Sequence, residues 1–306
     1  MRIAVTGAGG RLGRALLSAT EAAGLADGSD LIAWDLPEHD LDDPSSAERL
    51  VAAAQPDLVI NPAAWTDVDG CAREPDLAIR RNGIAVGEMA EACVRHGCSL
   101  ITVSTNEVFD GRRTDGRPYS PTDQPNPGNA YGAAKLAGER AATAAFERAG
   151  ESNGRRPELA IVRTAWLFGP PGADFPNKIV AAAQKAAAAG EPLRATFDEI
   201  GTPTYTVDLA AAIVSLISSE RPGHLWRPGI NHIVNAGRAS RAEWAREVLR
   251  IAGLSVPIEE VPMSTWPRPS TPPAWGVLEP TPLPGGPLRD WRDASVTYLE
   301  PQASSH

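Results

Sequence analysis

The chain has 306 residues, of which 42% are hydrophobic and 22% charged, and its formal net charge is −9. This composition is sufficient for one large or two interleaved folded domains, and it excludes intrinsic disorder. An acidic chain that has no basic stripe also argues against nucleic acid as a partner.

Features that would direct the chain to a membrane or an oxidising compartment are missing from the sequence. No apolar run reaches the roughly 18 residues of a membrane span, and residues 1–10 lack the layout of a signal peptide. The three cysteines, Cys71, Cys93 and Cys98, form no CxxC pair, which predicts neither a disulfide framework nor a zinc site. We therefore expect a cytoplasmic protein without a membrane partner.

Apolar runs typical of strands alternate with helical patterns over the first half of the chain. The predicted strands are residues 1–6, 31–34, 58–61, 99–103 and 159–163. The predicted helices are residues 14–24, 47–54, 77–96 and 130–148. This alternation predicts an α/β fold with a doubly wound parallel sheet.

The pattern changes beyond residue 163. Two more helices are predicted at 178–190 and 207–218, and residues 257–301 contain 11 of the 28 prolines. A segment so rich in proline is not expected to form a regular sheet. Its tryptophans, together with Trp244 just upstream, suggest that it packs as a lid or a substrate domain.

A glycine-rich turn joins the first predicted strand to the first helix. Gly7, Gly10 and Gly13 are three residues apart, a spacing that lets the backbone approach a pyrophosphate at the helix N-terminus. Asp35 ends the second strand, 22 positions after Gly13, close to where an acid that binds ribose is expected. The sequence therefore predicts a Rossmann-type site for a dinucleotide.

The identity of the dinucleotide stays open between NADH and NADPH. Asp35 favours a free ribose hydroxyl and hence NADH, whereas Arg11 in the loop could receive the 2′-phosphate of NADPH. We predict a dinucleotide-binding domain over residues 1–165 and about 196–222. A smaller C-terminal substrate-binding domain is predicted over about 166–195 and 223–306.

A tyrosine and a lysine are placed one helical turn apart in the predicted helix 130–148. Tyr131 and Lys135 share a helix face, where a cation lowers the pKa of a phenol and makes it a usable acid or base. The chain has 29 basic residues and only three lysines, so a lysine in this position is notable. Ser104 and Thr105 end the fourth strand, where a hydroxyl can bind a substrate carbonyl oxygen.

Together these motifs resemble the extended short-chain dehydrogenases/reductases, and most of all the dTDP-4-dehydrorhamnose reductase family. The matching segments are 7–13, 61–64 (NPAA), 104–111 (STNEVFDG), 131–139 (YGAAKLAGE), 163–169 (RTAWLFG) and 273–279 (PAWGVLE). The resemblance covers nearly the whole chain. It implies that hydride passes from NADH or NADPH to the C-4 keto carbon of a dTDP-4-keto-6-deoxy-hexose, the nucleotide-sugar substrate.

The resemblance also implies a role for each matching residue. Tyr131 would donate the proton, Lys135 would tune Tyr131 and hold the nicotinamide ribose, and Thr105 would orient the carbonyl. The residues expected to bind the cofactor are Gly7, Gly10, Arg11, Leu12, Gly13, Asp35, Leu36, Asp40, Leu41, Ala63, Ala64 and Thr66. The residues expected to bind the substrate are Val68, Ser104, Asn106 and Trp166. Pro272 stands where members usually carry an arginine, and Arg268 is a candidate replacement for recognising the diphosphate.

Two other functions remain open. Related sugar-nucleotide dehydratases carry Thr-Asp-Glu where this chain has Thr105, Asn106 and Glu107, and Asn106 has no catalytic proton to donate. The non-catalytic β subunit of methionine adenosyltransferase also resembles this family and binds a protein partner. Some members form magnesium-dependent dimers, but no acidic cluster predicts a metal site here, and we expect a monomer or a homodimer.

Overall fold

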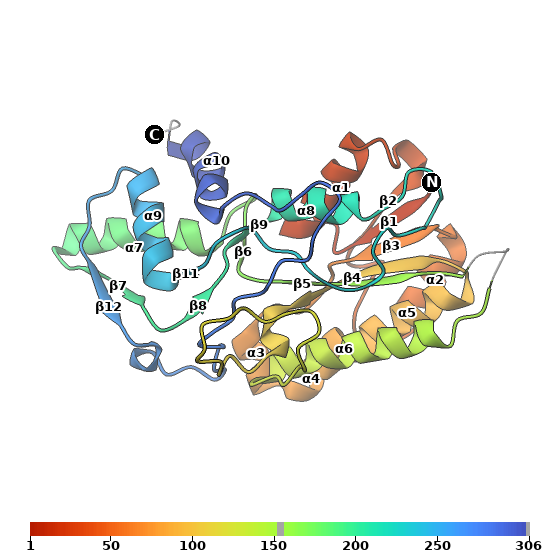
Figure 1. Cartoon of the computed structure of the whole chain (residues 1–306), viewed down its shortest axis with the longest axis horizontal. Coiled ribbons are helices and arrows are strands. Elements are labelled where there is room, and N and C mark those ends of the chain that lie inside the picture. Colours follow the sequence, from red (N-terminus) through yellow and green to blue (C-terminus); the bar gives the residue numbers. More distant parts are fainter. Residues whose placement is uncertain (152–155, 304–306) are drawn as a thin grey trace.

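The centre of the computed structural model is a six-stranded parallel sheet (Figure 1). The structure describes residues 1–151 and 156–303, so small parts of both predicted domains lie outside the described residues. The strands run in the order β10, β5, β4, β3, β1, β2. Their bounds are Ile3–Thr6 (β1), Leu31–Trp34 (β2), Leu58–Asn61 (β3), Ser99–Thr105 (β4), Leu159–Thr164 (β5) and Gly229–His232 (β10). The predicted doubly wound α/β fold is confirmed.

The strand order places a crevice between β1 and β3. The chain runs from β1 outward to β2 and then crosses to β3 on the other side of β1, with Ile3 paired to both Leu31 and Leu58. At such a switch point the loops after the two central strands separate and leave room for a ligand. The first five strands were predicted. The edge strand β10 was not, because Ile230 is its one apolar residue.

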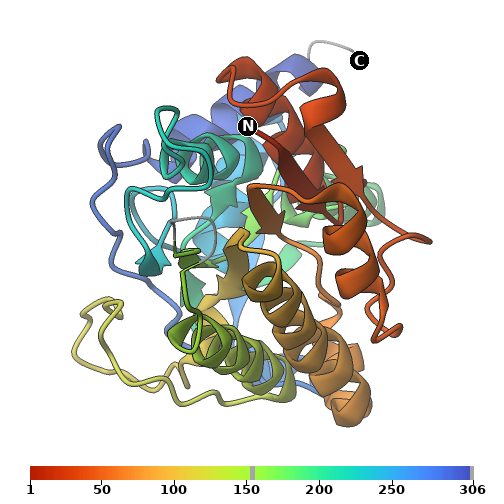
Figure 2. The same cartoon turned by 90° about the vertical axis from the view of Figure 1, so that its right-hand side faces the viewer.

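Helices cover both faces of the sheet (Figures 1 and 2). On one face α1 (Arg11–Ala22) and α8 (Thr206–Ser215) bury side chains such as Leu16 and Ile213 against the strands. On the other face lie α2 (Ser46–Ala54), α5 (Ala85–Arg95) and α6 (Ala130–Glu147), where Met89 and Phe146 are buried. The sheet is thus enclosed between two apolar layers, as parallel sheets require.

The predicted helix 77–96 has a more complex form. The chain passes from α3 (Val68–Arg73) through α4 (Pro75–Ile79) and a π-helical turn (Arg80–Ile84) into α5. The helix begins two residues early because proline is well suited to a first helical turn. Helix α6 packs very closely against the π-helical turn. A Cβ on Gly138 of α6 would be 2.5 Å from the carbonyl oxygen of Asn82 in that turn.

A second group of elements packs at one end of the sheet (the left of Figure 1). Its helices are α7 (Phe175–Ala189), α9 (Arg241–Ile251) and α10 (Trp291–Ala303). Its strands are the pairs β6 (Leu167–Phe168) with β9 (Thr204–Tyr205), β7 (Leu193–Thr196) with β12 (Ile258–Val261), and β8 (Ile200–Gly201) with β11 (Ala239–Ser240). Buried aromatic side chains form its core, among them Phe168, Trp244 and Trp291.

The expectation that the proline-rich tail forms no regular sheet is wrong. Residues of β12 pair in parallel with β7 along their whole length. Pro257 and Pro262 flank this strand rather than interrupt it, so their missing N–H groups cost no ladder hydrogen bond. Short 3-10 turns at Gly28–Asp30, Asn106–Val108 and Met263–Thr265 complete the described elements. None of the described helices has the length and hydrophobicity needed to cross a membrane.

Candidate active site

A cavity of about 710 Å³ opens at the carboxyl edge of the sheet, beside the second group of elements. Loops after β1 to β5 line it together with residues from α6 and α9. Apart from Arg268, all of the predicted site residues lie on its wall: Gly7, Gly10, Arg11, Leu12, Gly13, Asp35, Leu36, Asp40, Leu41, Ala63, Ala64, Thr66, Val68, Ser104, Thr105, Asn106, Tyr131, Lys135 and Trp166. The fold therefore brings these residues to one place, and their individual roles stay predictions.

The glycine loop forms the floor of one half of the cavity. Gly7 has a φ of +52°, and a Cβ on Gly13 would lie 2.1 Å from the carbonyl oxygen of Gly7. Only glycine therefore fits at both positions. No side chain caps the N-terminus of α1, which leaves the N–H groups of its first turn facing a cavity that Arg11, Leu12 and Gly13 line. This is the local structure that binds a phosphate.

Asp35 lies against the glycine loop at the end of β2. Its Oδ2 accepts a hydrogen bond from the backbone N–H of Gly9 at 2.5 Å, and its Oδ1 accepts one from Leu36 at 2.9 Å. A Cβ on Gly9 would be 2.4 Å from Oδ2, so the close approach depends on this glycine. The carboxylate is held rigidly at the cavity wall, where its remaining lone pairs can accept from ribose hydroxyls.

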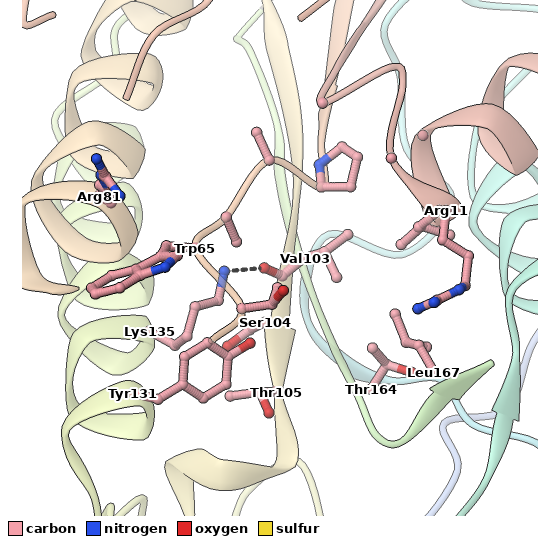
Figure 3. Close-up of a pocket in the computed structure, with 18 of the residues that line it drawn as sticks. Arg11, Trp65, Arg81, Val103, Ser104, Thr105, Tyr131, Lys135, Thr164 and Leu167 are labelled. Carbon is pink, nitrogen blue, oxygen red and sulfur yellow. Dashed lines mark hydrogen bonds between the residues drawn. The ribbon is translucent and has the colours of Figure 1, made fainter. Parts of the chain in front are cut away.

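Arg11 has a different position from the one expected of a 2′-phosphate ligand. Its Nε donates to the carbonyl oxygen of Gly169 at 3.1 Å and its Nη2 to that of Gly172 at 2.8 Å. The guanidinium therefore ties the glycine loop to the loop after β6. In Figure 3 it lies across the cavity from Trp65 and Arg81.

Tyr131 and Lys135 extend from the first turns of α6 toward β4 (Figure 3). Asn129 caps this helix by accepting a hydrogen bond from the N–H of Gly132 at 2.8 Å. The Nζ of Lys135 donates to the carbonyl oxygen of Val103 at 2.6 Å. Burial lowers the pKa of Lys135 to about 8, and the nearby carboxylate of Glu139 opposes that shift. The predicted shared face of the helix is thus confirmed by the geometry.

The expected lowering of the pKa of Tyr131 is wrong for this structure. Burial raises the pKa of its phenol well above the ordinary value, and the carboxylate of Glu107 raises it further. A hydrogen bond with Thr105 opposes the shift. The ammonium of Lys135 is instead bonded to the backbone of β4. The phenol is therefore protonated at neutral pH, as an ordinary tyrosine is, and this is the form that a proton donor needs.

A buried polar cluster lies behind the lysine and was not predicted. The Oγ of Ser104 donates to Oε1 of Glu139 at 2.5 Å. Arg163 donates two hydrogen bonds to Glu139, at 2.9 and 2.6 Å, and its guanidinium carbon lies 5.2 Å from the ring centre of Phe109. Ser104 therefore lines the cavity while its proton is engaged by Glu139. Ser104, Glu139 and Arg163 all belong to the sequence segments that carry the family resemblance, but the sequence did not indicate that they contact one another.

Thr105, Asn106 and Glu107 follow one another at the end of β4. Thr105 caps a short 3-10 turn by accepting from the N–H of Glu107 at 3.2 Å, and the amide of Asn106 donates to the carbonyl oxygen of Gly276 at 3.2 Å. Glu107 accepts from the amide of Asn129 at 2.6 Å, and burial raises its pKa. A protonatable carboxyl thus lies close enough to Tyr131 to shift the pKa of its phenol.

Another part of the cavity wall is aromatic and charged. Trp166, with a φ of +44°, lies under the guanidinium of Arg241, whose carbon is 3.5 Å from the ring centre. Arg241 also pairs with Glu199. Arg268, the predicted ligand of a diphosphate, instead pairs with Asp69 and is not among the residues that line the cavity.

Sequence reasoning missed several residues of the wall: His39, Pro62, Trp65, Arg81, Val103, Glu107, Thr164, Ala165, Leu167 and Arg241. Most of them adjoin a predicted site residue, so their neighbours in the chain gave a signal. Arg241 had none, because it lies at the start of an unpredicted helix. Within the described residues, no group of three or more His, Cys, Asp or Glu side chains could hold a metal ion.

Two features define the class of the protein. One is the glycine loop at the switch point of a parallel sheet, and the other is the tyrosine and lysine across the cavity from it. The protein is a Rossmann-type oxidoreductase. More particularly, the chain belongs to the family described as "RmlD substrate binding domain", whose model matches residues 1–303.

Named proteins of high similarity support this assignment. A dTDP-4-dehydrorhamnose reductase of Mycobacterium tuberculosis is 37% identical over 311 residues, which cover 99% of this chain and 94% of the relative. The crystal structure of such a reductase from Clostridium acetobutylicum matches with a TM-score of 0.83 and 29% identity over 99% of both chains. A reductase structure from Bacillus anthracis, in complex with NADP, gives a TM-score of 0.80 at 25% identity, covering 97% of this chain and 98% of the other.

Proposed function

We propose that this protein reduces the C-4 keto group of a dTDP-4-keto-6-deoxy-hexose with NADH or NADPH. The default product is dTDP-L-rhamnose, and a related deoxysugar nucleotide is the second candidate. The main support for this proposal is that Thr105, Tyr131 and Lys135 line the same cavity as the glycine loop. The 37% identity to a named reductase supports the same substrate class.

The residues present fit a nicotinamide dinucleotide. The uncapped start of α1 offers backbone N–H groups to a pyrophosphate, and Asp35 offers oxygens to a ribose. Lys135 stands across the cavity with its ammonium held by Val103, ready to donate to ribose hydroxyls. When bound, the dinucleotide would supply the hydride. The NADP in the Bacillus anthracis reductase makes the phosphorylated cofactor a candidate alongside NADH.

The chain's own residues would handle the carbonyl and the proton. The hydroxyl of Thr105 lies beside Tyr131 and would hold the carbonyl oxygen in line with the phenol (Figure 3). Tyr131 would then donate its proton to the alkoxide that develops as the carbonyl is reduced. A tyrosine phenol carries its proton at neutral pH, and the raised pKa of Tyr131 leaves that form unchanged. Trp166 and Val68, which line the same cavity, would border the sugar.

The other parts of the proposal follow from the same reading. Residues 1–165 with about 196–222 would bind the dinucleotide, and about 166–195 with 223–306 would bind the sugar nucleotide. Two parts of this division differ from the strand pairing: β8 and β9 pair within the second group of elements, and β10 belongs to the central sheet. Three free, buried cysteines support a reducing cytoplasm. We propose a monomer or a homodimer.

The alternatives make different predictions. Dehydration needs an acid at position 106, where Asn106 uses its amide to bind Gly276. A dehydratase or an epimerase would keep its NAD bound through purification, whereas a reductase exchanges it. A regulatory subunit would bind the dinucleotide, oxidise none of it, and co-purify with a synthetase.

The decisive test is oxidation of NADH and NADPH by the purified protein, given a dTDP-4-keto-6-deoxyhexose and the matching 3,5-epimerase. We expect turnover that falls by about 10²–10⁴-fold in Tyr131→Phe, since a positioned acid contributes that much. The affinity for the dinucleotide should stay unchanged. Tyr205→Phe is the matched control, because Tyr205 is buried in the core of the second group of elements. No oxidation by a protein that binds the dinucleotide would refute the proposal.

A further inference from the structure

Among the described residues, four cationic side chains line the cavity, and each of them already donates a hydrogen bond. Arg11 binds the carbonyl oxygens of Gly169 and Gly172. Arg81 forms a bidentate ion pair with Asp42, at 2.8 and 2.6 Å. Lys135 is held by Val103 beneath Tyr131.

Arg241 is the fourth cation and is bound differently. Both its Nε and its Nη2 donate to a single oxygen, Oε1 of Glu199, at 2.9 and 2.7 Å. No hydrogen bond from its Nη1 is present among residues 1–151 and 156–303. Its side chain is 23% exposed and lines the cavity. Nη1 therefore keeps its donors for a ligand in the cavity that Arg241 lines.

The surroundings fix the plane of this guanidinium. The ring of Trp166 lies 3.5 Å below its carbon, and Trp166 itself stacks on Trp244 at 5.9 Å. A Cβ on Gly201 would lie 2.5 Å from the ring of Trp166, so the backbone of β8 also packs closely against the indole. A planar fork held flat on an aromatic ring is well suited to the oxygens of a phosphate.

We propose that Arg241 binds the diphosphate of the nucleotide-sugar substrate, exchanging part of its pairing with Glu199 for the phosphate oxygens. This inference rests on the proposed function, since it assigns a ligand within the same cavity. Arg241 and Glu107 line the same cavity, and the charge of Arg241 opposes the rise that burial causes in the pKa of Glu107. A diphosphate attached to the far side of the sugar ring from C-4 would come within its reach.

Two acidic groups oppose an anion here and must be offset. Glu199 neutralises part of the charge of Arg241, and Glu107 lies nearby with a raised pKa. Protonation of Glu107 would reduce the repulsion, whereas Glu199 competes directly with the phosphate. Removing the charge of Glu199 should therefore leave the affinity for a diphosphate equal or raise it.

The test measures the binding of thymidine diphosphate and of thymidine by calorimetry, with protein saturated with NADP⁺. In Arg241→Met, which preserves an apolar stem over Trp166, we expect thymidine diphosphate to bind about tenfold more weakly or worse. The affinity for thymidine should be unchanged, because that probe lacks phosphate. The KM for the sugar nucleotide should rise while kcat changes little.

The controls separate a ligand from a structural residue. Arg246→Met removes another arginine of α9 that pairs with a glutamate, Glu260, but does not line the cavity, and it should bind both probes as the wild type does. Arg241→Lys should recover part of the affinity. Glu199→Gln should not weaken the binding of the diphosphate. Three results would overturn the assignment. Arg241→Met could bind thymidine diphosphate as well as the wild type does, or it could lose the same affinity for thymidine as for thymidine diphosphate. Alternatively, Glu199→Gln could lose as much affinity for the diphosphate as Arg241→Met does.

The outcome also distinguishes the inference from the proposed function. A wild-type protein that oxidises NADH or NADPH with the keto sugar, while Arg241→Met keeps its affinity for thymidine diphosphate, refutes the role of Arg241 alone. A wild-type protein that neither turns over nor binds thymidine diphosphate refutes both. The melting temperature and the NADP⁺ affinity show whether Arg241→Met folds. If it does not, Arg241→Lys is compared with the wild type instead. We then expect the lysine variant to bind thymidine diphosphate at least threefold more weakly, with its affinity for thymidine unchanged.

Discussion

Lys135 on α6 is bonded to the backbone of Val103 on β4, with its Nζ 2.6 Å from the carbonyl oxygen. This contact crosses from helix to sheet and fixes an ammonium at the floor of the cavity (Figure 3). Burial makes this ammonium easier to deprotonate, since the pKa of Lys135 falls to about 8. The charge of the site therefore changes in a range of pH that an experiment can reach.

The affinity for NADPH should depend on that charge. Below about pH 8 Lys135 is protonated and attracts an anionic ligand, and above that value the charge is lost. We expect the Kd for NADPH, measured by fluorescence from pH 6.5 to 9.5, to rise above about pH 8 in the wild type. In Lys135→Met binding should be weaker and nearly independent of pH. Lys178→Met, an exposed lysine of α7, should behave as the wild type. A wild-type Kd that is flat across the range would contradict the prediction.

The carboxylate of Glu107 should hold the phenol of Tyr131 in its protonated form. In Glu107→Gln that charge is absent, so the pKa of Tyr131 is expected to fall from its raised value. The measurement is a titration followed by the ultraviolet absorbance of phenolate. Subtracting the curve of the double variant Glu107→Gln/Tyr131→Phe from that of Glu107→Gln isolates the signal of Tyr131. The same difference in the wild-type background is the reference. A titration of Tyr131 at unchanged or higher pH would show that burial alone sets its pKa.

The ion pair between Arg163 and Glu139 should be costly to break. Their side chains are 1% and 5% exposed. Arg163→Met would leave the carboxylate buried without its charged partner, at a cost of about 3–5 kcal/mol in the free energy of unfolding. Arg148→Met, which breaks an exposed pair with Glu91, should cost about 1 kcal/mol or less. Denaturant unfolding of the two variants measures both values, and similar losses would argue against the prediction.

Arg11 should have little influence on the choice between NADH and NADPH. Its guanidinium is bonded to Gly169 and Gly172, so Arg11→Met is expected to change the affinities for both cofactors by a similar factor. Loss of a charged hydrogen bond to a 2′-phosphate would instead weaken NADPH selectively by about tenfold or more. Titration of the variant with each cofactor distinguishes the two outcomes. A selective loss of NADPH would restore the role that the sequence suggested.

Much of the fold and site could be predicted from local patterns. The glycines at 7, 10 and 13 and the Tyr131–Lys135 pair depend on spacing within one turn or one helix, and such spacing is visible in a sequence. The edge strand β10 could not be predicted, since its polar residues Asn231 and His232 are buried through pairing with β5. The strand β12 likewise forms because β7, distant in the chain, offers a partner.

The sequence by itself determined the doubly wound sheet, the dinucleotide loop and the residues that gather at the cavity, because each follows from hydrophobic periodicity or from short motifs. Only the tertiary structure decided what those side chains contact. Burial and the carboxylate of Glu107 raise the pKa of Tyr131, and the carbonyl groups of Gly169 and Gly172 accept hydrogen bonds from Arg11. Arg241 reaches the cavity from a helix more than 100 residues beyond Tyr131, and such proximity depends on the packing of the whole chain.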